Sequence, residues 1–179
     1  MIGAGALPIT EQAVRRLIRP GAPVIPARGA IRVALGEDRK AHLKQMHIVE
    51  GFDLSPFNRL TAPHYAISSD DERLALRSEP EDIFRFDFQS GGPFPDTRAS
   101  VSLAASGGLV NGIAQWPYFE IDDEVRYENR PSEGGFSIFG VIFHPLRKPI
   151  EMARGAELLV FGAQDRRSVR IWTEAPQVA

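Results

Sequence analysis

Cysteine is absent from the 179 residues, which excludes disulfide bonds, a thiolate nucleophile and any zinc site built on cysteine. Its absence is typical of a reducing compartment, and we expect a cytoplasmic protein. No apolar run approaches the roughly 18 residues of a membrane-spanning helix, so we expect no membrane partner. Residues 1–7 are apolar but few, contain no basic residue and run into Pro8, so they do not predict a signal peptide.

An excess of charge of one sign is also missing. The chain has 21 Lys and Arg against 23 Asp and Glu, giving a formal net charge of −2 that is spread along the sequence. Bulk electrostatic attraction to nucleic acid is therefore excluded, and we expect no nucleic-acid partner, although this argument does not apply to local patches. With 43% hydrophobic residues the chain has enough apolar material for the core of one globular domain.

One helix is predicted near the start of the chain. Residues 10–19 have helical periodicity, with Thr10 as the N-cap and Pro20 and Gly21 as the end. Four apolar residues of this segment share a face: Ala13, Val14, Leu17 and Ile18.

The rest of the chain is predicted to be mainly β. Apolar residues alternate at 31–35, 84–88 and 101–105, and further strand-like segments cover 109–116, 124–128, 137–143, 157–161 and 168–172. Glycine and proline turn signals separate them, including residues 145–149. Many short strands of this kind predict an antiparallel barrel or sandwich. Residues 53–82 interrupt the rhythm, and we expect an insertion there, with 63–71 as an excursion standing off the barrel.

The sequence predicts no catalytic, cofactor-binding or metal-binding residue in this chain. Gly3-Ala4-Gly5 lacks the preceding strand and the third glycine of a phosphate-binding loop. The four histidines contain no pair at i, i+4 spacing, and the acidic clusters at 70–72, 79–82 and 122–124 adjoin turns, where carboxylates keep loops solvated. There is no Gly-x-Ser-x-Gly nucleophile motif.

Several short motifs follow one another in a defined order. They are Arg-Pro-Gly-Ala-Pro-Val-Ile-Pro at 19–26, Gly-Phe-Asp-Leu-Ser at 51–55, Leu-Val-Asn-Gly-Ile-Ala-Gln-Trp at 109–116 and Phe-His-Pro-Leu-Arg-Lys-Pro-Ile at 143–150. This series resembles the C-terminal β-barrel portion of protein arginine methyltransferases (PRMTs). The resemblance implies that residues 1–28 are the end of a Rossmann-like methyltransferase domain and that 29–179 form the barrel, with an arm insertion at about 53–82.

The resemblance also implies partners. In that family the protein substrate lies in a cleft between the two domains, and the arm docks on the cofactor domain of the partner subunit. We therefore expect a homo-oligomer, with the missing cofactor domain or a protein substrate as further partners. The family positions give Phe57, His64 and Tyr65 as dimerisation-arm candidates. S-adenosylmethionine is implied for a full-length family member, and no cofactor is expected in this chain.

The chain departs from the family pattern at the substrate cleft. Where the family has Gly-Glu-Gly, this sequence has Ala4 between two glycines, and where the family has a Thr-His-Trp loop it has Ser137, Ile138 and Phe139. A carboxylate can pair with the substrate guanidinium, and alanine cannot. The resemblance thus implies Ala4, Ser137, Ile138 and Phe139 as cleft positions and a chain that does not transfer methyl groups alone.

A competing hypothesis is a free-standing β-sandwich or jelly roll that binds a carbohydrate or another small ligand. Its support is the number of short strands and three aromatic residues that we expect to be exposed: Tyr65, Tyr118 and Trp172. A jelly roll has no use for the helix at 10–19 with its Pro-Gly exit, so that helix favours the first interpretation.

Overall fold

The computed structural model describes residues 5–19, 21–41, 46–60, 64–131 and 139–174. It is mainly β and every strand pair described is antiparallel, which confirms the predicted fold class. The elements are α1 (Ala6–Leu17), β1 (Arg28–Asp38), β2 (Ile48–Val49), β3 (Phe52–Asp53), the 3-10 helix η3 (Ser55–Leu60), β4 (Tyr65–Ile67), β5 (Leu74–Leu76), β6 (Glu81–Asp87), β7 (Thr97–Ala104), β8 (Gly108–Glu120), β9 (Arg126–Glu128), β10 (Val141–Met152), β11 (Glu157–Gln164) and β12 (Val169–Thr173).

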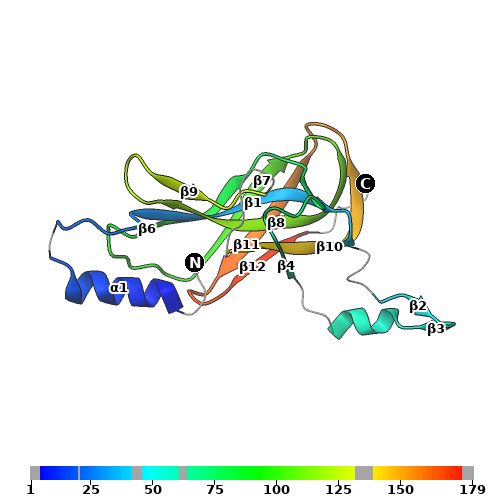
Figure 1. Cartoon of the computed structure of the whole chain (residues 1–179), viewed down its shortest axis with the longest axis horizontal. Helices are drawn as coiled ribbons and strands as arrows, with labels where there is room; N and C mark the ends of the chain where they lie inside the picture. The colour runs from blue at the N-terminus through cyan, green and yellow to red at the C-terminus, as the bar shows by residue number, and fades with distance from the viewer. Residues whose placement is uncertain (1–4, 20, 42–45, 61–63, 132–138, 175–179) are drawn as a thin grey trace.

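The larger of the two main sheets is built on the pairing of β1 with β8. Its strand order is β4-β10-β8-β1-β5, with β6 also paired to β1 and β9 also paired to β8. The two central strands stay in register from Arg28 opposite Glu120 to Gly36 opposite Gly112. Figure 1 shows these strands crossing the middle of the molecule, with α1 at one end and the β2–β3 hairpin at the other.

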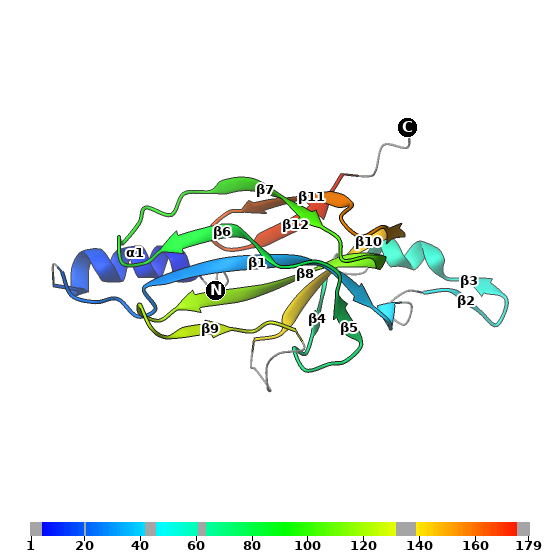
Figure 2. The same ribbon diagram turned by 90° about the horizontal axis from the view of Figure 1, so that it is seen from above.

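Two apolar clusters cover the two faces of this sheet. The smaller sheet, ordered β12-β11-β7, shares the main core with it, where Val33 and Leu35 of β1 meet Leu103 of β7 and Val160 of β11; Figure 2 shows the strands of the two sheets from above. A second cluster gathers Trp116, Phe143 and Val141 with Ile67 and Leu74. Alternation along the strands accounts for this division, because successive side chains point to opposite faces.

The N-terminal helix begins at Ala6, four residues before the predicted N-cap Thr10, and ends at Leu17. Pro8 falls in its first turn, where a missing N–H leaves no helical hydrogen bond unmade, so the helix can include it. Leu7 is fully buried, and Glu11 accepts a 2.6 Å hydrogen bond from the backbone N–H of Phe94 and pairs with Arg166. These contacts join α1 to the barrel.

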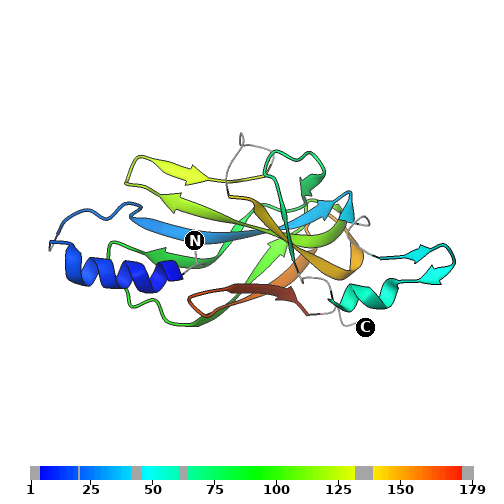
Figure 3. The same cartoon turned by 60° about the horizontal axis from the view of Figure 1, so that its bottom comes forward.

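The expected excursion at 63–71 is wrong for the part of it that is described. β4 belongs to the large sheet, where Ile67 lies opposite Val141 of β10, and Ile67 and Ser69 are buried. The segment that projects comes earlier, as the β2–β3 hairpin and η3 (Figure 3). The low apolar content of residues 63–71 is not evidence against a strand, because a three-residue edge strand such as β4 needs only one or two buried side chains.

β10 also differs from its prediction. The prolines of residues 145–149 predict a turn, but these residues lie within β10. The register of β10 against β8 shifts between Pro145 and Ile150, so the prolines stand where the ladder of hydrogen bonds is interrupted. Proline cannot donate to a ladder, and such an irregularity accommodates it.

We predict that Gly112→Ala destabilises the protein more than Gly36→Ala. A Cβ atom at Gly112 would overlap the ring of Phe143 and lie 2.9 Å from the carbonyl oxygen of His144. One at Gly36 would come closest to the edge of that ring, at 3.0 Å, with Leu74 and Ala114 at ordinary contact distances. We expect a loss of about 2 to 3 kcal/mol for Gly112→Ala and about 1 kcal/mol for Gly36→Ala in urea unfolding. Equal losses would contradict the packing of Phe143 against β8.

Candidate functional site: the projecting arm and its root

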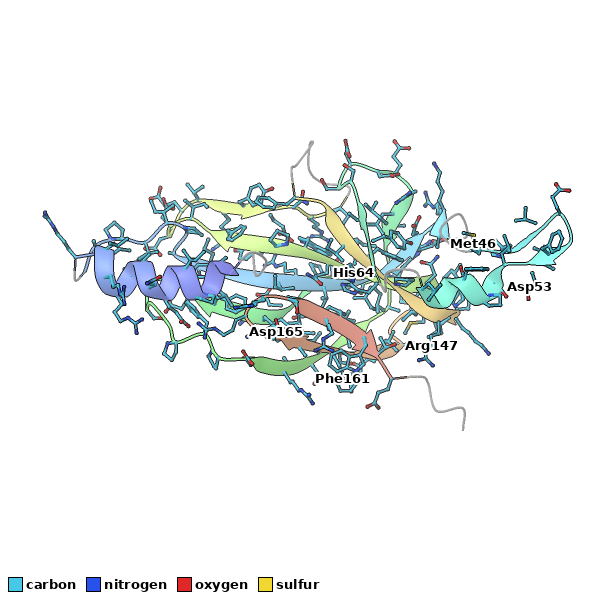
Figure 4. All side chains as sticks on the ribbon, turned by 90° about the horizontal axis from the view of Figure 1, so that it is seen from below. Met46, Asp53, His64, Arg147, Phe161 and Asp165 are labelled. Carbon is cyan, nitrogen blue, oxygen red and sulfur yellow. The ribbon has the colours of Figure 1, made fainter. Side chains whose placement is uncertain are left out.

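The projecting segment, residues 46–60, is the arm. Its apolar side chains are largely in solvent, with Phe52 72% and Leu60 81% exposed. Others of this kind are Met46, Ile48, Val49 and Phe57. Figure 4 shows Met46 and Asp53 on the arm, away from Phe161 and Asp165 on the small sheet. Exposed apolar patches of this kind are, in general, found at interaction sites.

Polar contacts define the conformation of the arm. Glu50 and Gly51 both have positive φ angles, of 50° and 82°, and form the two-residue turn between β2 and β3. The side chain of Asn58 accepts a 2.6 Å hydrogen bond from the backbone N–H of Met46 and donates a 3.0 Å bond to its carbonyl oxygen. The arm is therefore ordered by its own hydrogen bonds rather than by a core.

A buried carboxylate holds the root of the arm, where the chain leaves β1 and returns in β4. The Asp38 side chain has no exposed surface, and it accepts hydrogen bonds from the hydroxyl of Tyr65 at 2.7 Å and from the backbone N–H of Lys40 at 2.9 Å. Arg73 Nε lies 3.5 Å away and supplies the opposing charge. Burial, followed by the hydrogen bond to Asp38, raises the pKa of Tyr65, which keeps the donating hydroxyl protonated.

Two histidines meet at the same root. The rings of His64, beside β4, and His144, on β10, have centroids 5.4 Å apart, and His144 Nε2 lies 2.9 Å from Oε1 of Gln115. Burial lowers the pKa of His144 to about 4, with a smaller contribution from the charge of His64. His144 is therefore a neutral hydrogen-bonding group at neutral pH.

The structure separates the three residues that we assigned to the arm. Phe57 lies on η3 and is exposed, whereas His64 and Tyr65 lie at the root, and Tyr65 belongs to the large sheet. Among the cleft positions, Phe139 is described: its ring has an edge contact with Tyr127 at 6.3 Å and its carbonyl oxygen accepts a hydrogen bond from Asn129. Ala4, Ser137 and Ile138 lie outside the described residues.

Sequence reasoning missed a polar network on the outer face of the large sheet. Arg32 pairs with Asp82 at 2.9 Å and with Glu128 at 2.6 Å, and its guanidinium stacks 3.8 Å from the ring centre of Tyr118. Glu128 also accepts a 2.9 Å hydrogen bond from Trp116 Nε1. The sequence signal for this network is the position of Arg32 between the alternating apolar residues of β1. Each of these charges is already paired, so the network holds strands together and offers no free group for chemistry.

The network and the root also occupy two of the three aromatic residues named for the ligand-binding hypothesis. Tyr118 lies under Arg32, and Tyr65 donates to Asp38. Of the three, Trp172 is the one whose side chain is exposed, at 42%. Within the described residues no three His, Asp or Glu side chains gather as a metal site, and none of the helices is long and apolar enough to cross a membrane.

Comparison with known proteins places the fold. No protein-family profile matches the sequence, and no curated protein matches it. Among solved structures, a chain of the Trypanosoma brucei PRMT1 enzyme-prozyme heterotetrameric complex with AdoHcy superposes with a TM-score of 0.75. The chain has a PRMT-like fold. The match covers 99% of this chain and 63% of the other at 14% sequence identity, so the chain spans less than two thirds of that neighbour and the likeness concerns the fold.

We predict that His144 makes stability fall between about pH 6.5 and pH 4. In the unfolded chain this histidine takes up a proton at about pH 6.5, but in the folded protein it does so only at about pH 4. Between these two pH values the unfolded state therefore binds more protons than the folded state. The contribution to the free energy of unfolding is about 3 kcal/mol at neutral pH and is lost as the pH falls through this window.

Urea unfolding at pH 7 and pH 4.5 tests this in three proteins. The difference between the two pH values should shrink in His144→Gln and stay unchanged in His47→Gln, which alters an exposed histidine of the arm. If His144→Gln keeps the full pH dependence, the ring is not buried in its neutral form.

Proposed function

We propose that this chain is the barrel-and-arm half of a PRMT-like protein and that it acts in dimerisation and in substrate binding. The observation that carries the proposal is the arm. A segment of fifteen described residues, 46–60, extends its apolar side chains into solvent from a fold that is PRMT-like. The exposed Phe52, Phe57 and Leu60 are suited to an apolar patch on a partner subunit.

The opposite end of the molecule supports a second interface. Ile9 and Leu17 of α1 and Ile25 in the segment after it are exposed, at 61%, 81% and 70%. The other side of α1 is already packed on the barrel through Leu7 and Glu11. We propose that a cofactor domain covers this outer side of α1, in the place that the sequence resemblance gives to the end of a methyltransferase domain.

In this proposal the chain is not catalytic by itself. S-adenosylmethionine binds to the other half, and this chain supplies one wall of the substrate cleft through the region of Ala4, Ser137, Ile138 and Phe139. The neighbour that shares the fold is a complex with AdoHcy and is a heterotetramer, which supports the relevance of the cofactor and of oligomers to proteins of this shape. The jelly-roll alternative has no comparable support.

We predict that the isolated chain self-associates through these exposed surfaces. Replacing two large side chains of the arm, in Phe52→Ser with Leu60→Ser, should weaken association about tenfold or more, because each buried side chain of this size contributes about 1.5 to 3 kcal/mol. Sedimentation or light scattering over a concentration series measures the effect.

Val125→Ser is the matched control, since Val125 is 52% exposed but lies far along the chain from the arm, after β8. It should leave association unchanged. A wild-type chain that stays monomeric at high concentration, or a control that weakens association equally, would argue against the arm as an interface.

A further prediction concerns catalysis. Fusing a PRMT cofactor domain upstream of Met1 should give a folded protein with negligible arginine methylation. Ala4 leaves the substrate guanidinium without its second carboxylate, and losing one partner of a desolvated charge pair costs about 3 to 5 kcal/mol, or roughly two to four orders of magnitude in rate. Ile138 cannot hydrogen-bond or titrate as a histidine does.

Methyl transfer to an arginine-rich peptide from a labelled donor tests this. The unmodified fusion is compared with one carrying Ala4→Glu and Ile138→His, and activity should rise only in the doubly substituted protein. Strong methylation by the unmodified fusion would remove both positions from the roles proposed for them. The chain without the added domain, which should not bind S-adenosylmethionine, is the blank.

A further inference from the structure

The outer face of the small sheet carries a pair of aromatic rings, of which Trp172 is exposed and Phe161 is half-buried. Phe161 of β11 and Trp172 of β12 lie opposite each other in register, with ring centroids 5.9 Å apart and planes inclined by only 15°. Their neighbours along these strands, Val160 and Ile171, point the other way into the core. We call Phe161 and Trp172 the ring pair; Figure 4 shows Phe161 at the edge of the molecule.

Two arginines stand one row further along the same face. Ala163 of β11 is in register with Arg98 of β7 on one side and with Arg170 of β12 on the other. This row lies two residues from the ring pair, which in a strand is roughly 7 Å. Because Ala163 has a small side chain, the space between the two guanidinium groups is not filled from β11.

Arg98 and Arg170 form no ion pair with any residue in the described part of the chain. They differ in this from Arg166, whose guanidinium is turned to Glu11 of α1, and from Arg32. Both line a cavity of about 300 Å³ together with Ala163, Gln164, Asp96 and Asp165. This volume is at the lower end of the range for small-molecule sites.

The acidic residue Asp165 is committed to its own turn. Its Oδ1 accepts hydrogen bonds from the backbone N–H groups of Arg167 at 3.0 Å and Ser168 at 2.7 Å and from the hydroxyl of Ser168 at 3.0 Å. These bonds, led by the one from the backbone of Ser168, lower the pKa of Asp165. Its carboxylate is therefore held in the turn between β11 and β12. Asp96 is the other acidic residue of the lining, and the two arginines, which have no ion pair within the described residues, are the groups that can receive an anion.

We propose that this face binds a nucleotide, with the base stacked on the ring pair and the phosphate held between Arg98 and Arg170. Bases stack on aromatic side chains irrespective of sequence, and guanidinium groups bind phosphate through paired N–H donors. In a nucleoside 5′-phosphate the ribose separates the phosphate from the base. The arginines are likewise separated from the rings, by two residues along the strand, so base and phosphate can reach both groups at once. The site lies on strands other than those of the arm root and does not rest on the proposed function.

Charge complementarity separates this ligand from a neutral sugar. A sugar could stack on Trp172, but it would leave the two arginines without an ion pair, whereas a phosphate pairs with both. The nucleotide could be free or part of a single strand. The lining of the cavity offers two arginines, enough for one phosphate, so a mononucleotide is expected to bind with most of the affinity of an oligonucleotide.

Titration of the whole chain with adenosine 5′-monophosphate tests the proposal, with binding followed by calorimetry and by quenching of the exposed Trp172, since Trp116 is buried. We expect saturable binding that weakens about tenfold or more in Trp172→Ala and in Arg98→Ala with Arg170→Ala, and that is largely kept in Trp172→Phe. Adenosine and inorganic phosphate should each bind far more weakly, because each lacks one half of the ligand.

Arg147→Ala is the matched control, an exposed arginine of β10 shown in Figure 4, and it should bind as the wild type does. A single-stranded decanucleotide tests the source: affinity similar to that of the mononucleotide supports a free nucleotide, and much tighter binding overturns that choice. No saturable binding of adenosine 5′-monophosphate, or binding that survives both the Trp172→Ala and the double arginine substitution in folded protein, overturns the site.

Discussion

The pairing of β1 with β8 is the constraint on which the remaining structure depends. These two long strands keep one register from Arg28 opposite Glu120 to Gly36 opposite Gly112, and the other strands of the large sheet attach to one or the other of them or to β10. Because both faces of the pair are covered by apolar clusters, a slip of one residue would turn the side chains of the slipped strand from one cluster toward the other. Register here thus fixes where the arm leaves and where the small sheet packs.

The arm root shows how a fold can present an apolar segment without losing order. Asp38 ends β1 and Tyr65 begins β4, so their 2.7 Å hydrogen bond joins the departing and returning chain across 26 intervening residues of sequence, which include the whole arm. The carboxylate is fully buried, and a buried charge left without its partners would be costly. Because its root is fixed in this way, the arm can project from the sheet in a defined direction although it has almost no hydrophobic core of its own.

The fold was largely predictable from the sequence, whereas the site was predictable only in part. Alternating apolar residues located β1, β6 and β7, because alternation directly reflects burial on one face. β4 has three residues, too few for an alternating pattern to be recognised. α1 begins before the predicted N-cap at Thr10, because proline is tolerated in the first turn of a helix. The contacts of Asp38 and Arg32 join strands far apart in sequence, and a single sequence holds no signal for such pairings.

The prolines of β10 have a consequence for the behaviour of the protein in a crowded solution. β4 covers β10 only from Val141 to Phe143, so the remaining outer edge of β10 is not paired by β4. Pro145 and Pro149 remove two N–H donors from this strand, and the basic Arg147 and Lys148 stand between them. An incoming strand from another chain would find an incomplete ladder and a positive charge there. A protein with so many exposed apolar side chains on its arm is in this way guarded against fibril-like growth along this edge of its sheet.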